Sequence, residues 1–167
     1  MDGLNGGGAA GAGGGGVMVL GATNRPDDLD DAFQRRFQKR IYIPLPGAAE
    51  REALLRLCLR EVPLDRAADL ADIARRTEHY SGADLSVVAK HAALAPMRRL
   101  QAEAARAFPR PEQMMQRLQA IQAGEARALA QPVGQGDLRE AVAANRPSAN
   151  PESIGYFKKY AAEHGAT

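Results

Sequence analysis

Two short apolar runs on either side of a charged stretch constrain the fold of this chain more than any other feature. They are Val17–Leu20 and Ile41–Ile43. Each is too short for a stable helix and rich in β-branched or aromatic residues, so both are predicted to be strands. The first run shows no polar alternation, which is typical of a central strand in a parallel sheet covered on both faces. The stretch from 17 to 46 therefore predicts part of an α/β sheet.

Polar and charged residues follow the first run, at the place where a parallel sheet binds ligands. In open α/β sheets the ligand crevice lies outside the carboxyl ends of the strands. The pair Thr23-Asn24 falls there, and the amide of Asn24 is suited to hold a water or a phosphate oxygen. Asp27–Asp30 supplies acidic first-turn residues for a short helix, which is predicted to end at Arg35-Arg36.

This stretch resembles a known family. The block GATNRPDDLDDAF, followed by RRF, KR and IYIPLP, is similar to the second half of the ATPase core of AAA+ proteins. The branch is the one that holds katanin, spastin, fidgetin and the ATPase that disassembles ESCRT-III filaments. The later SGAD and the tail from Arg146 extend the resemblance, which runs from Val17 to Gly165, and the tail and LREVPLD favour the katanin catalytic subunit. A long block in the same order is far more specific than a lone short motif.

The resemblance implies roles for five residues. Asn24 falls on the sensor-1 asparagine, which orients the attacking water within its own subunit. Arg35 and Arg36 fall on the paired arginine fingers, which reach the γ-phosphate of the neighbouring subunit's ATP in a homo-hexamer. Gly82 and Ala83 fall where the family places backbone against adenine and ribose.

The residues alone leave simpler alternatives open for two of these motifs. Arg35-Arg36 would also complement the negative end of a helix dipole. Ser81–Asp84 has the form of a capping box, a hydroxyl at the N-cap with an acid three residues on, which needs no ligand.

The expected organisation is an α/β part followed by a helical part, so that the chain is mostly α overall. Four segments are expected. They are a flexible glycine-rich loop at 1–16, the C-terminal part of the AAA+ large α/β subdomain at 17–46, the helical lid at 47–148 with a mobile insert at about 104–131, and a C-terminal helix at 149–167.

The nucleotide-binding signature of an ATPase is not complete in these 167 residues. No GxxxxGK[ST] occurs, and no apolar strand ends in paired acids. The cofactor implied by the resemblance is ATP, with Mg²⁺ held by parts that this chain does not include. We therefore expect a partial ATPase that is inactive alone. A second hypothesis is a non-catalytic module that docks on full-length subunits through its lid.

Other classes of function are not favoured. His79, His91 and His164 are widely spaced and Cys58 is the single cysteine, so neither a metal site nor a disulfide framework is predicted. The basic residues are dispersed without a nucleic-acid-reading signature, and no apolar run approaches the ~18 residues of a membrane span.

The partners and the location follow from the resemblance. The resemblance implies that the hexamer uses ATP hydrolysis to remodel a protein polymer. Tubulin in microtubules is the expected polymer, and an ESCRT-III-type filament is the alternative. A secretory signal is not visible at Met1, so a cytoplasmic, cytoskeleton-associated protein is expected.

Overall fold

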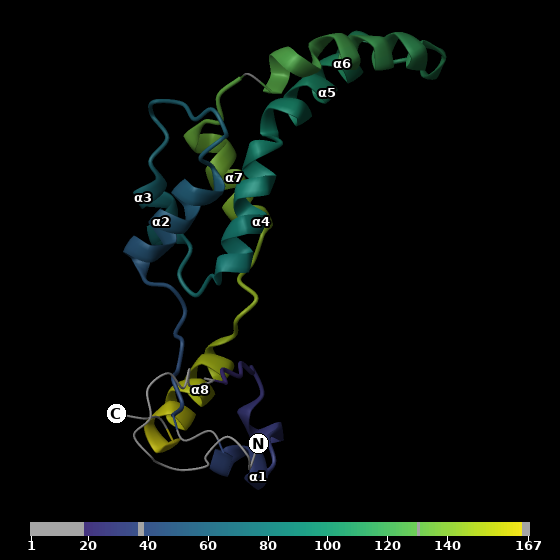
Figure 1. Ribbon diagram of the computed structural model, residues 1–167. Coiled ribbons are helices and arrows are strands. Elements are labelled where there is room, and N and C mark those ends of the chain that lie inside the picture. Colours follow the sequence, from purple (N-terminus) through teal and green to yellow (C-terminus); the bar gives the residue numbers. More distant parts are fainter. Residues whose placement is uncertain (1–18, 37–38, 130, 165–167) are drawn as a thin grey trace, which may run out of the picture. The chain divides into compact units, whose positions relative to one another are not determined.

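The computed structural model of the protein describes residues 19–36, 39–129 and 131–164, and they are mostly helical, as predicted (Figure 1). The elements in chain order are η1 (Pro26–Asp28), α1 (Asp31–Arg36), α2 (Ala48–Cys58), α3 (Leu70–Arg76), α4 (Gly82–Ala93), α5 (Ala95–Ala107), η2 (Pro111–Gln113), α6 (Met114–Leu129), α7 (Gln135–Ala144) and α8 (Pro151–His164). The chain divides into two compact units, one of residues 1–42 with 158–167 and one of residues 43–157. Each unit is considered separately below.

The two predicted strands are not confirmed. Val19-Leu20 and Ile41–Ile43 carry no regular structure, and Val17 and Met18 lie outside the described residues. A strand is held by hydrogen bonds to a neighbouring strand, and the pairing found in the described residues is an isolated parallel bridge between Leu64 and Val133. The aliphatic side chains of the described part of these runs, Val19, Leu20, Ile41 and Ile43, consequently stay on the surface, with Leu20 89% and Ile43 85% exposed.

The first unit contains the short helix predicted between the apolar runs. A 3-10 turn, η1, begins at Pro26, which is buried, and helix α1 follows it and ends at Arg36. Arg25 and Asp28 form an ion pair of 2.9 Å across this turn. Both side chains of the pair are exposed, so it adds little to stability.

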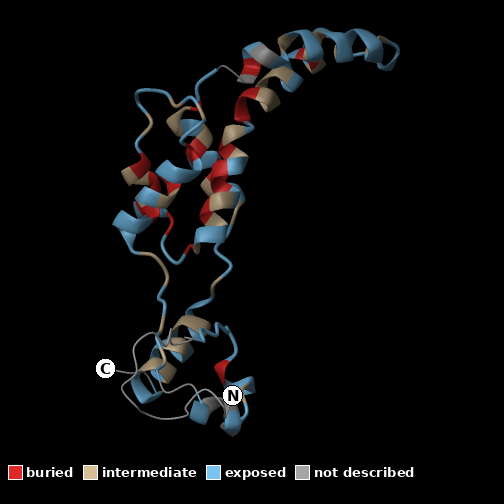
Figure 2. Cartoon of the chain, in the orientation of Figure 1, coloured by how far each residue is buried: buried red, intermediate tan, exposed pale blue. Residues whose placement is uncertain are grey.

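A hydrophobic core in the second unit lies among helices α2, α3, α4 and α7 (Figure 2). Each of these helices turns an apolar stripe inward, as expected for amphipathic helices. The largest apolar side chains that are almost completely buried in it are Leu55, Leu59, Ile73, Leu85, Leu138, Val88 and Val133.

Arg51 on α2 is a buried cation in this unit, 7% exposed. Its Nε and Nη2 donate to the carbonyl of Ala74 in the last turn of α3, at 3.0 and 2.8 Å, and its Nη1 donates to the carbonyl of Pro46 at 2.8 Å. A positive charge is favourable at the C-terminal end of a helix. Arg51 therefore connects α2 to α3 and to Pro46, near the start of the second unit.

Helices α5 and α6 pack against one another in an antiparallel pair (Figure 1). A Cβ added to Gly124 would lie 2.8 Å from Cδ1 of Leu100, so the glycine permits the close approach of the two helices. The sparse apolar pattern predicts weak order at about 104–131, and α6 forms there nonetheless. A helix does not measure motion, so the mobility of this insert stays a prediction for hydrogen exchange.

Candidate functional site

Asn24 lies on the surface of the first unit. It occupies a bend directly before η1 and is exposed. The hydroxyl of Thr23 accepts a hydrogen bond from the backbone N–H of Arg25 at 3.0 Å, which bridges over Asn24. The side chain of Asn24 is therefore presented to solvent by a local turn.

Arg35 and Arg36 lie in the last turn of α1, in the same unit as Asn24, and both are exposed. Guanidinium groups at the C-terminal end of a helix complement its dipole. An exposed guanidinium also stays charged and presents a planar fork that binds phosphate in two places. The position suits either a structural or a phosphate-binding role.

Gly82 and Ala83 are the first two residues of α4, in the second unit, and both are exposed. The capping box predicted around them is confirmed. The N–H of Asp84 donates to Oγ of Ser81 at 3.2 Å, and the N–H and Oγ of Ser81 both donate to Oδ2 of Asp84 at 2.8 Å. This reciprocal pair fixes where α4 begins.

The protein's own packing does not require glycine at position 82. A Cβ added there would meet only Cδ1 of Leu54 within 4 Å, at an ordinary 3.9 Å, and the backbone is not in the left-handed region. The backbone at Gly82 is therefore exposed, and no contact within the described residues calls for a residue without a Cβ at this position.

Asp84 and Asp137 are among the aspartates of the second unit whose pKa lies below the ordinary value. Burial raises the pKa of Asp84, but the hydrogen bonds from Ser81 and Ser148 outweigh it, so its pKa lies below the ordinary value. Burial likewise raises the pKa of Asp137, and the Arg99 hydrogen bond, with that from the N–H of Gly134, brings it below the ordinary value. Nη1 of Arg99 lies 2.7 and 2.8 Å from the two Asp137 oxygens.

These lowered pKa values predict a loss of stability in acid. A carboxyl whose pKa is lower in the folded state stabilises the fold above its unfolded value, near 3.8, and this contribution disappears as the pH falls through the folded-state pKa. We expect the urea concentration at the midpoint of unfolding to decrease as the pH is lowered below about 4. In Asp137→Asn this decrease should be smaller. Glu112→Gln, at an exposed position on η2, is the control. An equal effect of both substitutions would contradict the assignment to Asp137.

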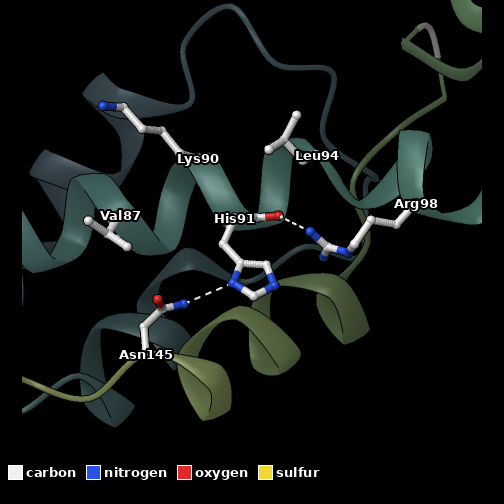
Figure 3. Close-up of a pocket in the computed structure, with 6 residues that line it drawn as sticks. All are labelled: Val87, Lys90, His91, Leu94, Arg98 and Asn145. Carbon is white, nitrogen blue, oxygen red and sulfur yellow. Dashed lines mark hydrogen bonds between the residues drawn. The ribbon is translucent and has the colours of Figure 1, made fainter.

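A shallow hollow of about 460 Å³ lies between α4, the start of α5 and the end of α7 (Figure 3). Its lining residues are Val87, Lys90, His91, Leu94, Arg98 and Asn145. The carboxamide nitrogen of Asn145 lies 3.0 Å from Nδ1 of His91, and Nη1 of Arg98 donates to the carbonyl of His91 at 3.0 Å. These contacts fasten α4 to α7 and α5, so the hollow is explained by packing between helices.

The predicted site residues thus fall in two places. Asn24, Arg35 and Arg36 belong to the first unit, and Gly82 and Ala83 to the second. Within the described ranges, no group of three carboxylate, imidazole or thiol side chains forms a metal-binding cluster. No helix there is both long and apolar enough to cross a membrane.

Comparison with known proteins identifies the family. Residues 1–45 match the ATPase family associated with various cellular activities (AAA), and residues 67–106 match the AAA+ lid domain. The chain belongs to the AAA+ ATPase family. Over 170 residues it is 39% identical to the A-like 1 form of the katanin p60 ATPase-containing subunit from Rattus norvegicus, with 99% of this chain and 32% of the relative covered. It therefore spans about a third of the length of that relative.

Solved structures of the same family resemble this fold. The FIGL-1 AAA domain in complex with ADP has a TM-score of 0.72 at 29% identity, over 90% of this chain and 46% of that one. A structure described as the structural basis for katanin self-assembly has a TM-score of 0.65 at 31% identity, over 81% of this chain and 43% of that one.

Asp84 and Ser148 form a contact beside Gly82 and Ala83 that the sequence analysis did not predict. The acid was assigned to a local cap, whereas it also accepts hydrogen bonds from Ser148, 64 residues away. Spacing along the chain reveals helix caps, but it carries no signal for such a long-range contact.

Proposed function

We infer that this chain is the carboxyl-terminal part of an ATP-hydrolysing AAA+ subunit of the katanin type, which works as a homo-hexamer. The observation that carries this proposal is the katanin similarity over 99% of the chain. This similarity covers both the block with Asn24, Arg35 and Arg36 and the SGAD turn. The relative is named as an ATPase-containing subunit, which supports ATP hydrolysis. The similar katanin structure is described as the basis for self-assembly, which supports a homo-hexamer.

The proposed roles divide between two neighbouring subunits. Asn24 orients the attacking water in its own subunit, and Arg35 and Arg36 neutralise charge on the phosphoryl group bound by the next subunit. Residues 17–20 and 41–43 pair with other strands of the complete large subdomain. Their exposed apolar side chains, such as Leu20 and Ile43, support this pairing.

Gly82 and Ala83 are proposed to contact the adenine and ribose of ATP. The exposed backbone at the start of α4 and the lack of any packing need for glycine at 82 support this contact. Bound ATP with Mg²⁺ would supply the phosphoryl group to be transferred. No described residue is assigned to the metal, because no acidic cluster suited to it is found among them.

The proposed substrate is a protein polymer, and microtubules are favoured because the similarity to katanin subunits runs through almost the whole chain. With microtubules as the substrate, the proposed location is the cytoplasm, on the cytoskeleton. An ESCRT-III-type filament is the second candidate for the polymer. One preparation is assayed for severing of microtubules and for disassembly of ESCRT-III filaments, and the assay that shows activity identifies the polymer.

The proposal predicts that Asn24→Ala lowers ATP turnover. The test protein is a chimera in which residues 1–167 replace the matching third of the rat katanin A-like 1 protein. Loss of the water-orienting amide is expected to lower kcat roughly a hundredfold and to leave nucleotide affinity nearly unchanged. Gln101→Ala, at an exposed position on α5, is the control and should keep full turnover.

The same assay includes the 167-residue chain alone, which is expected to show no turnover because the phosphate loop is not in it. Turnover by the chain alone that disappears in Asn24→Ala would refute the partial-ATPase interpretation. Full activity of the Asn24→Ala chimera would refute the role of the amide.

A further inference from the structure

One carboxylate oxygen joins two segments that lie far apart in the sequence. Oδ2 of Asp84 accepts hydrogen bonds from the N–H and Oγ of Ser81, both at 2.8 Å, within the turn that begins α4. The same oxygen accepts from the N–H of Ser148 at 3.2 Å and from its Oγ at 3.0 Å. Ser148 lies in the segment 145–150, which connects α7 to α8 (Figure 1).

The charge of Asp84 makes this junction stronger than an ordinary surface contact. An aspartate is ionised at neutral pH, and the hydrogen bonds from Ser81 and Ser148 hold the pKa of Asp84 below its ordinary value. Hydrogen bonds to an ionised acceptor are about twice as strong as neutral ones. Asp84 is half-buried, so water competes less for these donors.

A second contact holds the same segment at its start. The hydroxyl of Tyr80, the residue before Ser81, donates to the backbone carbonyl of Asn145. Burial and the nearby charge of Asp84 both raise the pKa of this phenol, which therefore remains a donor. The turn before α4 thus contacts segment 145–150 at Asn145 through Tyr80 and at Ser148 through Asp84.

We propose that Asp84 is a positioning residue that holds segment 145–150 against the turn at Ser81–Ala83. Nucleotide bound at Gly82 and Ala83 orders this turn, and the Asp84–Ser148 contact transmits that order to the segment that enters α8. The coupling is reciprocal, because a link between two elements changes both equilibria by the same factor. The inference rests on the proposed function, since it takes Gly82 and Ala83 as the nucleotide contact.

Hydrogen exchange of the chimera, with and without ADP, tests this coupling. In the unmodified chimera ADP is expected to slow amide exchange across 145–150 severalfold. Ser148→Ala removes the hydroxyl that donates to Asp84. It should abolish most of this slowing and weaken ADP binding by about three- to tenfold. Ser148→Thr keeps a hydroxyl and should retain the response.

Ser153→Ala is the matched control. Its hydroxyl and N–H bond to the side chain of Asn150, the last residue of the segment, so the substitution removes a similar contact at the far end of 145–150 without touching α4. The ADP response of 145–150 should be unchanged in this variant. A merely structural role of Ser148 would raise exchange equally with and without ADP, and would leave ADP affinity unchanged.

Two failures are distinguishable. If the unmodified chimera does not bind ADP, the proposed function is rejected and this inference falls with it. If the chimera binds ADP but Ser148→Ala responds to ADP as the unmodified chimera does, only the positioning role is overturned. Asp84→Asn, which keeps the side chain's size, is the second variant and should lose the ADP response in the same way.

Discussion

Replacement of Arg35 or Arg36 by alanine in the chimera should lower ATP turnover by about a thousandfold or more, with nucleotide binding to one subunit nearly intact. The physical reason is that each guanidinium would neutralise charge that develops on the phosphoryl group only in the transition state. Both residues are exposed in the last turn of α1. Steady-state turnover and ADP affinity, measured on the same preparations, check this prediction.

The double variant distinguishes the two interpretations of this arginine pair. If both groups serve one transition state, Arg35→Ala and Arg36→Ala together should cost far less than the sum of the single losses. If the pair only complements the helix dipole, each substitution should cost roughly 0.3–1 kcal/mol of stability, and turnover per folded hexamer would not change. Arg66→Ala, at an exposed position in the second unit, controls for loss of surface charge.

Leu55→Ala should lower the free energy of unfolding of the second unit by about 2–5 kcal/mol. Leu55 is fully buried, among side chains of α2, α3, α4 and α7, and its truncation leaves a cavity in that core. Urea unfolding of the 167-residue chain, followed by circular dichroism, measures the change in the free energy of unfolding.

Leu57→Ala is the control for this measurement, because it makes the same chemical change two residues along the same helix. Leu57 is 60% exposed, so its truncation should change stability by no more than about 0.5 kcal/mol. Similar losses for the two variants would show that α2 does not bury the face assigned to it.

The helical part of the fold was predictable from local patterns. The capping box at Ser81–Asp84 and the end of α1 at Arg36 both depend on spacings within a few residues. These spacings survive into the structure because helix hydrogen bonds and caps are local.

Contacts between distant residues were less predictable. Strands at Ile41–Ile43 depend on partners elsewhere in the sheet, and the described residues bring none to them. An amphipathic pattern assigns charged residues to solvent, whereas Arg51 is buried on the carbonyls of Ala74 and Pro46. The Asp84–Ser148 contact likewise joins positions whose spacing carries no signal.

The candidate site divides in the same way. The identities of Asn24, Arg35, Arg36, Gly82 and Ala83 came from the order of a long family-like block, and the family is confirmed. Their roles remain predictions, because each depends on a bound nucleotide, and the roles of Arg35 and Arg36 depend also on a neighbouring subunit. The structure adds an observation that no motif contains, namely that packing does not demand glycine at position 82.

Mixing two inactive chimeras tests the central proposal most directly. One carries Arg35→Ala with Arg36→Ala and keeps its nucleotide pocket, and the other keeps both arginines but has its Walker B acid replaced. If the arginines act on the neighbour's ATP, mixed hexamers contain interfaces in which an intact pocket faces intact fingers, and ATP turnover should partly return. Turnover that stays at the level of the separate inactive proteins, in hexamers shown to be mixed, would contradict the proposal.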